Sequence, residues 1–142
     1  MFSIRALPLL VIPFLLYNMI AFGFGISGQP SETFASELFS TTMPSGAEWV
    51  FTTRDLIMVI TLMLLAVEMI KASYVSRGAA SLTDQALSLV LFVVCLIQFL
   101  LVDVAATSLF LLITLTSAID VVTGAIISVQ TARRDFGFGG AQ

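Results

Sequence analysis

The sequence predicts an all-α membrane protein with four transmembrane helices in an antiparallel bundle and a small extracytoplasmic β-hairpin between the first and second helices. Two observations carry this prediction. The 142 residues are 58% hydrophobic and only 11% charged, with a mean hydropathy of +1.07, which lies outside the range of soluble globular proteins. The apolar residues also fall into long stretches close to the roughly 20 residues that cross a bilayer core. This length allows a single domain covering residues 1–142.

The first stretch, residues 4–25, combines Arg5 with a long apolar run. A secretory signal peptide also starts with a charge and an apolar region. Here the apolar part is long for a signal peptide, and no A-x-A cleavage site follows Gly25. We therefore expect a first transmembrane helix, with Pro8 in its first turns and a kink at Pro13.

Residues 26–54 are polar and contain most of the turn-forming residues, so they are expected to form an outer loop. Within it we predict a short helix at 31–40 and a β-hairpin at 39–53 around a Pro-Ser-Gly turn. An isolated two-stranded hairpin is marginal in water. It should therefore lean on the bilayer through Trp49 and Phe51, with Trp49 as an interfacial anchor, or on another subunit.

Three further spans are predicted at about 55–74, 82–102 and 105–131, followed by a glycine-rich tail at 132–142 that we expect to be mobile. Thr53 is the expected N-cap of the second span, and Ser81 opens an S-x-x-D pattern at the start of the third. The third and fourth spans are expected to form a tight antiparallel hairpin.

The positions of the basic residues predict the topology. One side of the membrane receives Arg5, Lys71, Arg77, Arg133 and Arg134, and the other receives only Arg54. The positive-inside rule then places both termini in the cytoplasm and the loop outside. Arg133 and Arg134 are expected to act as interface anchors.

Four polar residues inside the spans form two expected layers. Glu68 and Asp120 lie at similar depths towards the cytoplasm, and Asn18 and Gln98 lie at similar depths towards the outside. An ion pair with Lys71 would explain why Glu68 lies inside the span, and this explanation requires no functional role. Asn18 and Gln98 are expected to form interhelical hydrogen bonds.

Asp120 belongs to a face of small and polar residues on the fourth span. Thr116, Asp120, Gly124 and Ser128 follow at i, i+4 spacing, with Ser117 and Thr123 beside them. Small residues allow close helix packing, and hydroxyls can hydrogen-bond a buried carboxyl. The alternative is that Asp120 handles a proton or an ion, since intramembrane acids often mark such pathways.

The composition also excludes several kinds of site. The chain has no histidine and one cysteine, Cys95, so it cannot build a disulfide within the chain, a His- or Cys-based metal site, or His-ligated haem. No Ser, Cys or metal constellation predicts catalysis, and no basic patch predicts nucleic-acid binding. We expect no catalytic, cofactor-binding or metal-binding residues.

Comparison with known membrane-protein types narrows the possibilities. Small multidrug exporters need an acid in their first helix, where this chain has Asn18, and quinone-dependent disulfide-forming proteins need more than a lone Cys95. Small subunits of tripartite transporters share only the topology. The PSGAEW segment before the second span and the IDVVTG…ARRD ending resemble uncharacterised small four-helix bacterial inner-membrane proteins, a resemblance that implies no activity.

These observations leave three function hypotheses. The first is a non-enzymatic accessory, assembly or scaffolding subunit of a larger membrane complex, which contacts lipid and other subunits, or copies of itself, through its hairpin and the face of the fourth span. The second is a small homo-oligomeric transporter or channel that uses Asp120 and Glu68 for protons or cations. The third is an enzyme acting on a lipid with two carboxylates.

Overall fold

The structure is a computed structural model that describes the backbone of residues 7–23, 30–74 and 79–137, and the side chains of 7–23, 32–72 and 83–130. It is mostly helical with one two-stranded antiparallel hairpin, which confirms the coarse fold prediction. In chain order the elements are α1 (Val11–Gly23), α2 (Pro30–Phe34), β1 (Glu37–Thr42), β2 (Glu48–Thr52), α3 (Thr53–Tyr74), α4 (Ala79–Leu101), the 3₁₀ turn η2 (Asp103–Ala105) and α5 (Ser108–Gly137).

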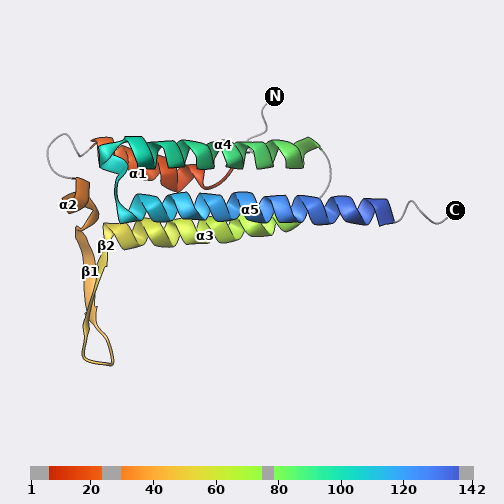
Figure 1. Cartoon of the computed structure of the whole chain (residues 1–142). Helices are drawn as coiled ribbons and strands as arrows, with labels where there is room; N and C mark the ends of the chain where they lie inside the picture. Colours follow the sequence, from red (N-terminus) through yellow and green to blue (C-terminus); the bar gives the residue numbers. More distant parts are fainter. Residues whose placement is uncertain (1–6, 24–29, 75–78, 138–142) are drawn as a thin grey trace.

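The long helices lie side by side and alternate in direction, as Figure 1 shows. α5 is the central helix, because it makes the most extensive contacts with both α4 and α3. The hairpin leaves the end of the bundle where α3 begins and extends across the helix axes (Figure 1). α1 covers only part of the bundle's length, so the end farther from the hairpin is built from α3, α4 and α5.

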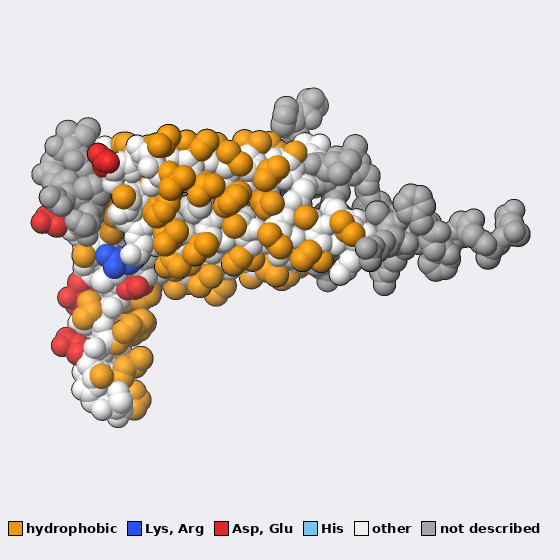
Figure 2. Space-filling model, in the orientation of Figure 1, with side chains coloured by type: hydrophobic (Ala, Val, Ile, Leu, Met, Phe, Trp, Pro, Cys, Tyr) orange, Lys and Arg blue, Asp and Glu red, His pale blue; other side chains and the backbone are white. Residues whose placement is uncertain are grey.

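Two helices of the described chain are long and apolar enough to cross a membrane: Thr83–Leu101 within α4 and Ser108–Gln130 within α5. The most apolar windows of these helices are only 17% and 33% buried, so they are not the core helices of a soluble fold. Many of their large hydrophobic side chains are exposed, and hydrophobic side chains are spread over the face of the bundle seen in Figure 2. This finding supports membrane association.

The prediction of four such helices is wrong for α1 and α3. The 13 described residues of α1 extend about 20 Å at 1.5 Å per residue, less than the roughly 30 Å of a bilayer core. α3 is long enough but carries Arg54, Asp55, Glu68 and Lys71. A short helix and a charged helix therefore accompany the two apolar ones.

Several predicted boundaries also differ from the structure. α1 begins at Val11, not at residue 4, so Pro13 lies in its first turn, where a missing N–H breaks no intrahelical bond. The helix expected at 31–40 ends at Phe34, because the chain enters β1 at Glu37. α4 begins three residues before the predicted start.

The start and end of α5 also depart from the prediction. A 3₁₀ turn precedes it, and the hydroxyl of Thr107 accepts a hydrogen bond from the backbone N–H of Phe110 at 3.2 Å, which is N-cap geometry. The helix runs on to Gly137, so the predicted mobile tail is helical up to that residue. Residues 138–142 of that tail lie outside the described residues.

A capping box joins the hairpin to α3. The carboxylate of Asp55 accepts hydrogen bonds from the backbone N–H of Thr52 at 2.9 Å and from its hydroxyl at 2.7 Å. This is the half of a capping box in which the side chain of the third helical residue reaches back to the N-cap. The cap is therefore Thr52, one residue before the predicted Thr53.

An aromatic cluster fills the end of the bundle nearest the hairpin. The buried ring of Tyr17 stacks on Phe34 with 4.8 Å between centroids and tilts against Phe110 at 4.7 Å. Its hydroxyl donates to the backbone oxygen of Val104 at 2.8 Å and lies 2.7 Å from the hydroxyl of Thr107. Tyr17 thus ties α1 to α2, η2 and the start of α5.

Candidate functional site

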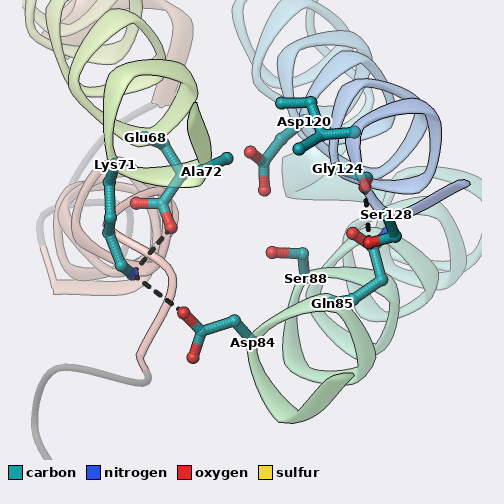
Figure 3. A pocket seen from close by; sticks show the side chains of 10 residues that line it. Glu68, Lys71, Ala72, Asp84, Gln85, Ser88, Asp120, Gly124 and Ser128 are labelled. Carbon is teal, nitrogen blue, oxygen red and sulfur yellow. Dashed lines mark hydrogen bonds and ion pairs between the residues drawn. The ribbon is translucent and has the colours of Figure 1, made fainter. Parts of the chain in front are cut away.

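A polar cavity of about 50 Å³ lies between α3, α4 and α5, at the end of the bundle away from the hairpin. This exceeds the roughly 10–15 Å³ that one water requires. Most of its lining side chains are polar or small: Glu68, Lys71, Ala72, Asp84, Gln85, Ser88, Asp120, Gly124, Ile127 and Ser128. Figure 3 shows side chains from three helices converging on this space.

Lys71 links two carboxylates across the cavity. Its ammonium nitrogen lies 3.0 Å from Oε1 of Glu68 on the same helix and 3.6 Å from Oδ2 of Asp84 on α4 (Figure 3). The predicted pair between Glu68 and Lys71 is confirmed. The contact with Asp84 was not predicted, because sequence spacing cannot show which residue of a neighbouring helix lies opposite.

Glu68 also holds the segment that leads into α1. Its Oε2 accepts a hydrogen bond from the backbone N–H of Leu9 at 3.0 Å. Leu9 precedes the helix, so its N–H has no intrahelical acceptor and needs another partner. Glu68, which is 5% exposed, therefore connects α1 and α3 at the depth where α1 starts.

Asp120 lines the same cavity from α5 and is 7% exposed. Its carboxyl interacts with the hydroxyl of Ser88 on α4 and with the charges of Glu68 and Lys71. In Figure 3 the Ser88 hydroxyl extends into the space between α4 and α5. The structure thus brings Glu68 and Asp120 together, as the count of helical depth predicts.

The hydroxyls of Thr116, Ser117 and Ser128 on α5 do not donate hydrogen bonds to Asp120, which corrects the prediction. Thr116 and Ser117 both donate to the backbone oxygen of Ile113, at 2.7 and 3.1 Å, and Ser128 donates to that of Gly124 at 2.9 Å. Each of these hydroxyls donates to a backbone oxygen of its own helix. Hydroxyls commonly bond the carbonyl one turn earlier, and this local bond competes with reaching a neighbouring side chain.

Gly124 is a position where a side chain of α4 lies against the backbone of α5. A Cβ at this residue would lie 2.0 Å from Oε1 of Gln85. The amide of Gln85 crosses the glycine and donates to the backbone oxygen of Val121 at 2.8 Å. At Gly124 the predicted small-residue face of α5 is therefore covered by Gln85 of the same chain.

Asn18 and Gln98, the second predicted layer, are hydrogen-bonded to each other. The amide of Gln98 donates to the side-chain oxygen of Asn18, and the amide of Asn18 donates to the backbone oxygen of Phe14 at 2.8 Å. These bonds satisfy two polar side chains between α1 and α4. The pair lies nearer the hairpin end than the cavity does.

The predicted anchors lie in β2 and in the last part of α5. Trp49 is in β2 and 42% exposed, and it contacts Phe39 and Phe51. Arg133 and Arg134 belong to α5, but their side chains lie outside the described part of the structure, as do Arg5 and Arg77. Most of the basic residues on which the topology prediction depends therefore have side chains outside the described part of the structure.

The cavity holds three carboxyl groups and one ammonium group, an arrangement that can hold water and exchange protons. Among the described residues, no three His, Cys, Asp or Glu side chains form a group suited to a metal ion. Cys95 is fully buried. Towards the hairpin, Tyr17, Phe110 and Ile113 are fully buried in the core.

Three comparisons with known proteins found none that is similar to this chain. No family model matches it, and neither a curated protein nor a solved structure does so.

Proposed function

We propose that this chain is a multi-pass protein of a bacterial inner membrane, with its hairpin outside the cytoplasm, and that it works as a non-enzymatic accessory or assembly subunit. The apolar, largely unburied surfaces of α4 and α5 support the membrane location. α3 would cross as well, since its 22 residues extend about 33 Å and its charges lie near its two ends. The resemblance to small bacterial inner-membrane proteins points the same way.

The hairpin is the observation that carries the proposed role. β1 is exposed along its whole length, and the strand pair extends away from the bundle as an arm with two open edges (Figure 1). Unpaired strand edges are a common means of adding a strand from another chain. A subunit that holds a neighbour in a membrane complex needs such a surface.

Purification from the native membrane in mild detergent tests this role. We expect the parent chain to elute in a complex larger than a monomer and to bring a defined partner with it. A matched variant in which a short glycine linker replaces 38–51 should lose that partner while remaining in the membrane. A strictly monomeric, partner-free parent chain would contradict the proposal.

The polar cavity favours a second candidate function, proton or cation handling by a homo-oligomer. Asp120 and Glu68 share a water-sized space, and the core towards the hairpin is packed with fully buried residues, so symmetry would have to supply a path. Flux measurements in liposomes should then show a loss for Asp120→Asn. Asp103→Asn removes an acid from the other end of the bundle and should leave the flux unchanged, and a parent chain without flux would exclude this function.

A further inference from the structure

The three aromatic residues of the hairpin form one continuous face. In the strand pairing Phe39 lies opposite Phe51, and Thr41 lies opposite Trp49. Since side chains alternate between the faces of a strand, these four residues share one side. The ring centroids are 5.0 Å apart for Phe39 and Phe51, 5.8 Å for Phe39 and Trp49, and 5.6 Å for Trp49 and Phe51.

The opposite face of the hairpin is mainly polar. It carries the cross-strand pairs Ser40 with Val50 and Thr42 with Glu48. The hairpin is therefore amphipathic, with its large rings on one side and a carboxylate on the other. A two-stranded sheet of this kind is marginal by itself in water, so its aromatic face needs a covering surface.

The bundle contributes little of that cover. Phe39 and Trp49 are 50% and 42% exposed, and β1 is exposed throughout. The link to the rest of the chain lies at the base of the strands, where the N–H of Thr53 donates to the backbone oxygen of Ser36 at 3.0 Å and the two hydroxyls lie 2.7 Å apart. Beyond that base the arm stands away from the helices.

The direction of the arm shows which surface its aromatic face meets. The hairpin extends sideways past α3, roughly across the helix axes (Figure 1). In Figure 2 its hydrophobic side chains gather along the edge turned towards the side where the helices lie, and acidic side chains lie along the opposite edge. For helices that cross a bilayer, the first edge is turned to the membrane surface beside the bundle and the second to water.

We propose that the aromatic face of the hairpin, formed by Phe39, Trp49 and Phe51, lies in the headgroup region of the outer leaflet next to α3. Aromatic rings with a polar atom are enriched at this depth. The residues 37–52 include two acids and no Lys or Arg, so the contact is apolar and aromatic and does not depend on anionic lipid. This inference rests on the transmembrane placement of the helices proposed above.

Trp49 is the only tryptophan of the chain, so its fluorescence reports on the hairpin directly. The full chain is reconstituted in zwitterionic phosphatidylcholine vesicles that carry a nitroxide either on the headgroup or deep on the acyl chain. We expect emission shifted to shorter wavelength than for free tryptophan, strong quenching by the headgroup label, weak quenching by the deep label, and loss of quenching by aqueous iodide. Replacing part of the lipid with anionic phosphatidylglycerol should not increase the quenching by the headgroup label.

Two matched variants in a Trp49→Phe background separate the possible failures. Val50→Trp places the reporter on the opposite face of the same strand, and it should be quenched by iodide and much less by lipid labels. Val90→Trp places it on the outer surface of α4, where Val90 is 58% exposed, and it should be quenched by the deep label. If Val90→Trp is not quenched by the deep label, the transmembrane placement itself fails.

Two outcomes would overturn the inference while leaving the transmembrane placement intact. In both, Val90→Trp is quenched by the deep label. In the first, Trp49 is as open to iodide as Val50→Trp, and the hairpin stands in water. In the second, Trp49 is protected from iodide but is not quenched by either lipid label, and a protein surface covers it.

Discussion

Gly124 and Gln85 act as one unit between α4 and α5. The amide of Gln85 occupies the space that any side chain at 124 would need, and it bonds the backbone of α5 at Val121. A glycine inside a helix costs up to about 1 kcal/mol relative to alanine, so its presence here is explained by the close approach of a neighbour.

A double-mutant cycle measures this coupling. Gly124→Ala improves helix propensity but forces Gln85 out of its hydrogen bond, whereas in a Gln85→Ala background only the improvement remains. We expect Gly124→Ala to be less favourable in the parent chain than in the Gln85→Ala chain, by roughly 0.5–1.5 kcal/mol in the free energy of unfolding in detergent. Equal effects in both backgrounds would show that the two residues do not meet.

Tyr17 is the residue that closes the hairpin end of the core. Tyr17→Phe keeps the stack on Phe34 but removes the bonds to Val104 and Thr107. The expected loss is roughly 1–2 kcal/mol in the free energy of unfolding, because a partly buried carbonyl and a partly buried hydroxyl lose a partner. Thermal unfolding followed by circular dichroism checks this, and the loss should shrink in a Thr107→Val background, which already lacks one of the two bonds.

At the scale of elements, the charged cluster holds the helices together where α1 is absent. Lys71 joins α3 to α4, and Glu68 joins α3 to the residues before α1. These contacts lie in the part of the bundle that the short α1 does not cover. Polar contacts between helices matter there because lipid offers helices no hydrophobic reason to associate.

Removal of the ammonium group tests this role. Lys71→Met leaves the carboxylates of Glu68 and Asp84 without their shared cation. Because Lys71 is partly exposed, we expect the loss of unfolding free energy to lie between the ~1 kcal/mol of an exposed ion pair and the ~3–5 kcal/mol of a fully buried one. Adding Asp84→Asn should recover part of the loss. If Lys71→Met unfolds at the same temperature as the parent, the cluster does not hold α3 to α4.

At the scale of the whole molecule, the bundle and the hairpin arm are nearly independent. The buried core lies among the helices and α2, and the strands contribute no fully buried side chain. The arm can therefore specialise in contact with lipid or a partner without affecting the packing of the bundle.

Replacement of 38–51 by a short glycine linker tests this independence. The bundle should unfold within a few degrees of the parent, because Phe34 and the aromatic core remain in place. Circular dichroism and thermal unfolding in detergent provide the measurement. A large fall in the unfolding temperature would mean that the hairpin stabilises the helices, and would contradict its independence from the bundle.

Much of the fold and half of the candidate site follow from local patterns. Alternating aromatic and β-branched residues around a Pro-Ser-Gly turn predict the hairpin, and helical spacing predicts the pairing of Glu68 with Lys71. Equal depth predicts that Glu68 meets Asp120 and that Asn18 meets Gln98. Asp84, Gln85 and Ser88 were not predicted as site residues, because their importance depends on the rotation of α4 about its axis.

The sequence by itself determined the helical class, the apolar surfaces and the position of the hairpin, because composition and periodicity are properties of neighbouring residues. Only the tertiary structure decided that the described part of α1 has 13 residues and that Gln85 covers Gly124. It also decided that Ser88 of α4 lines the same cavity as Asp120, while Thr116 and Ser117 bond their own helix. The physical reason is that the residues that meet across two helices depend on how those helices rotate and pack, which the spacing along one helix does not fix.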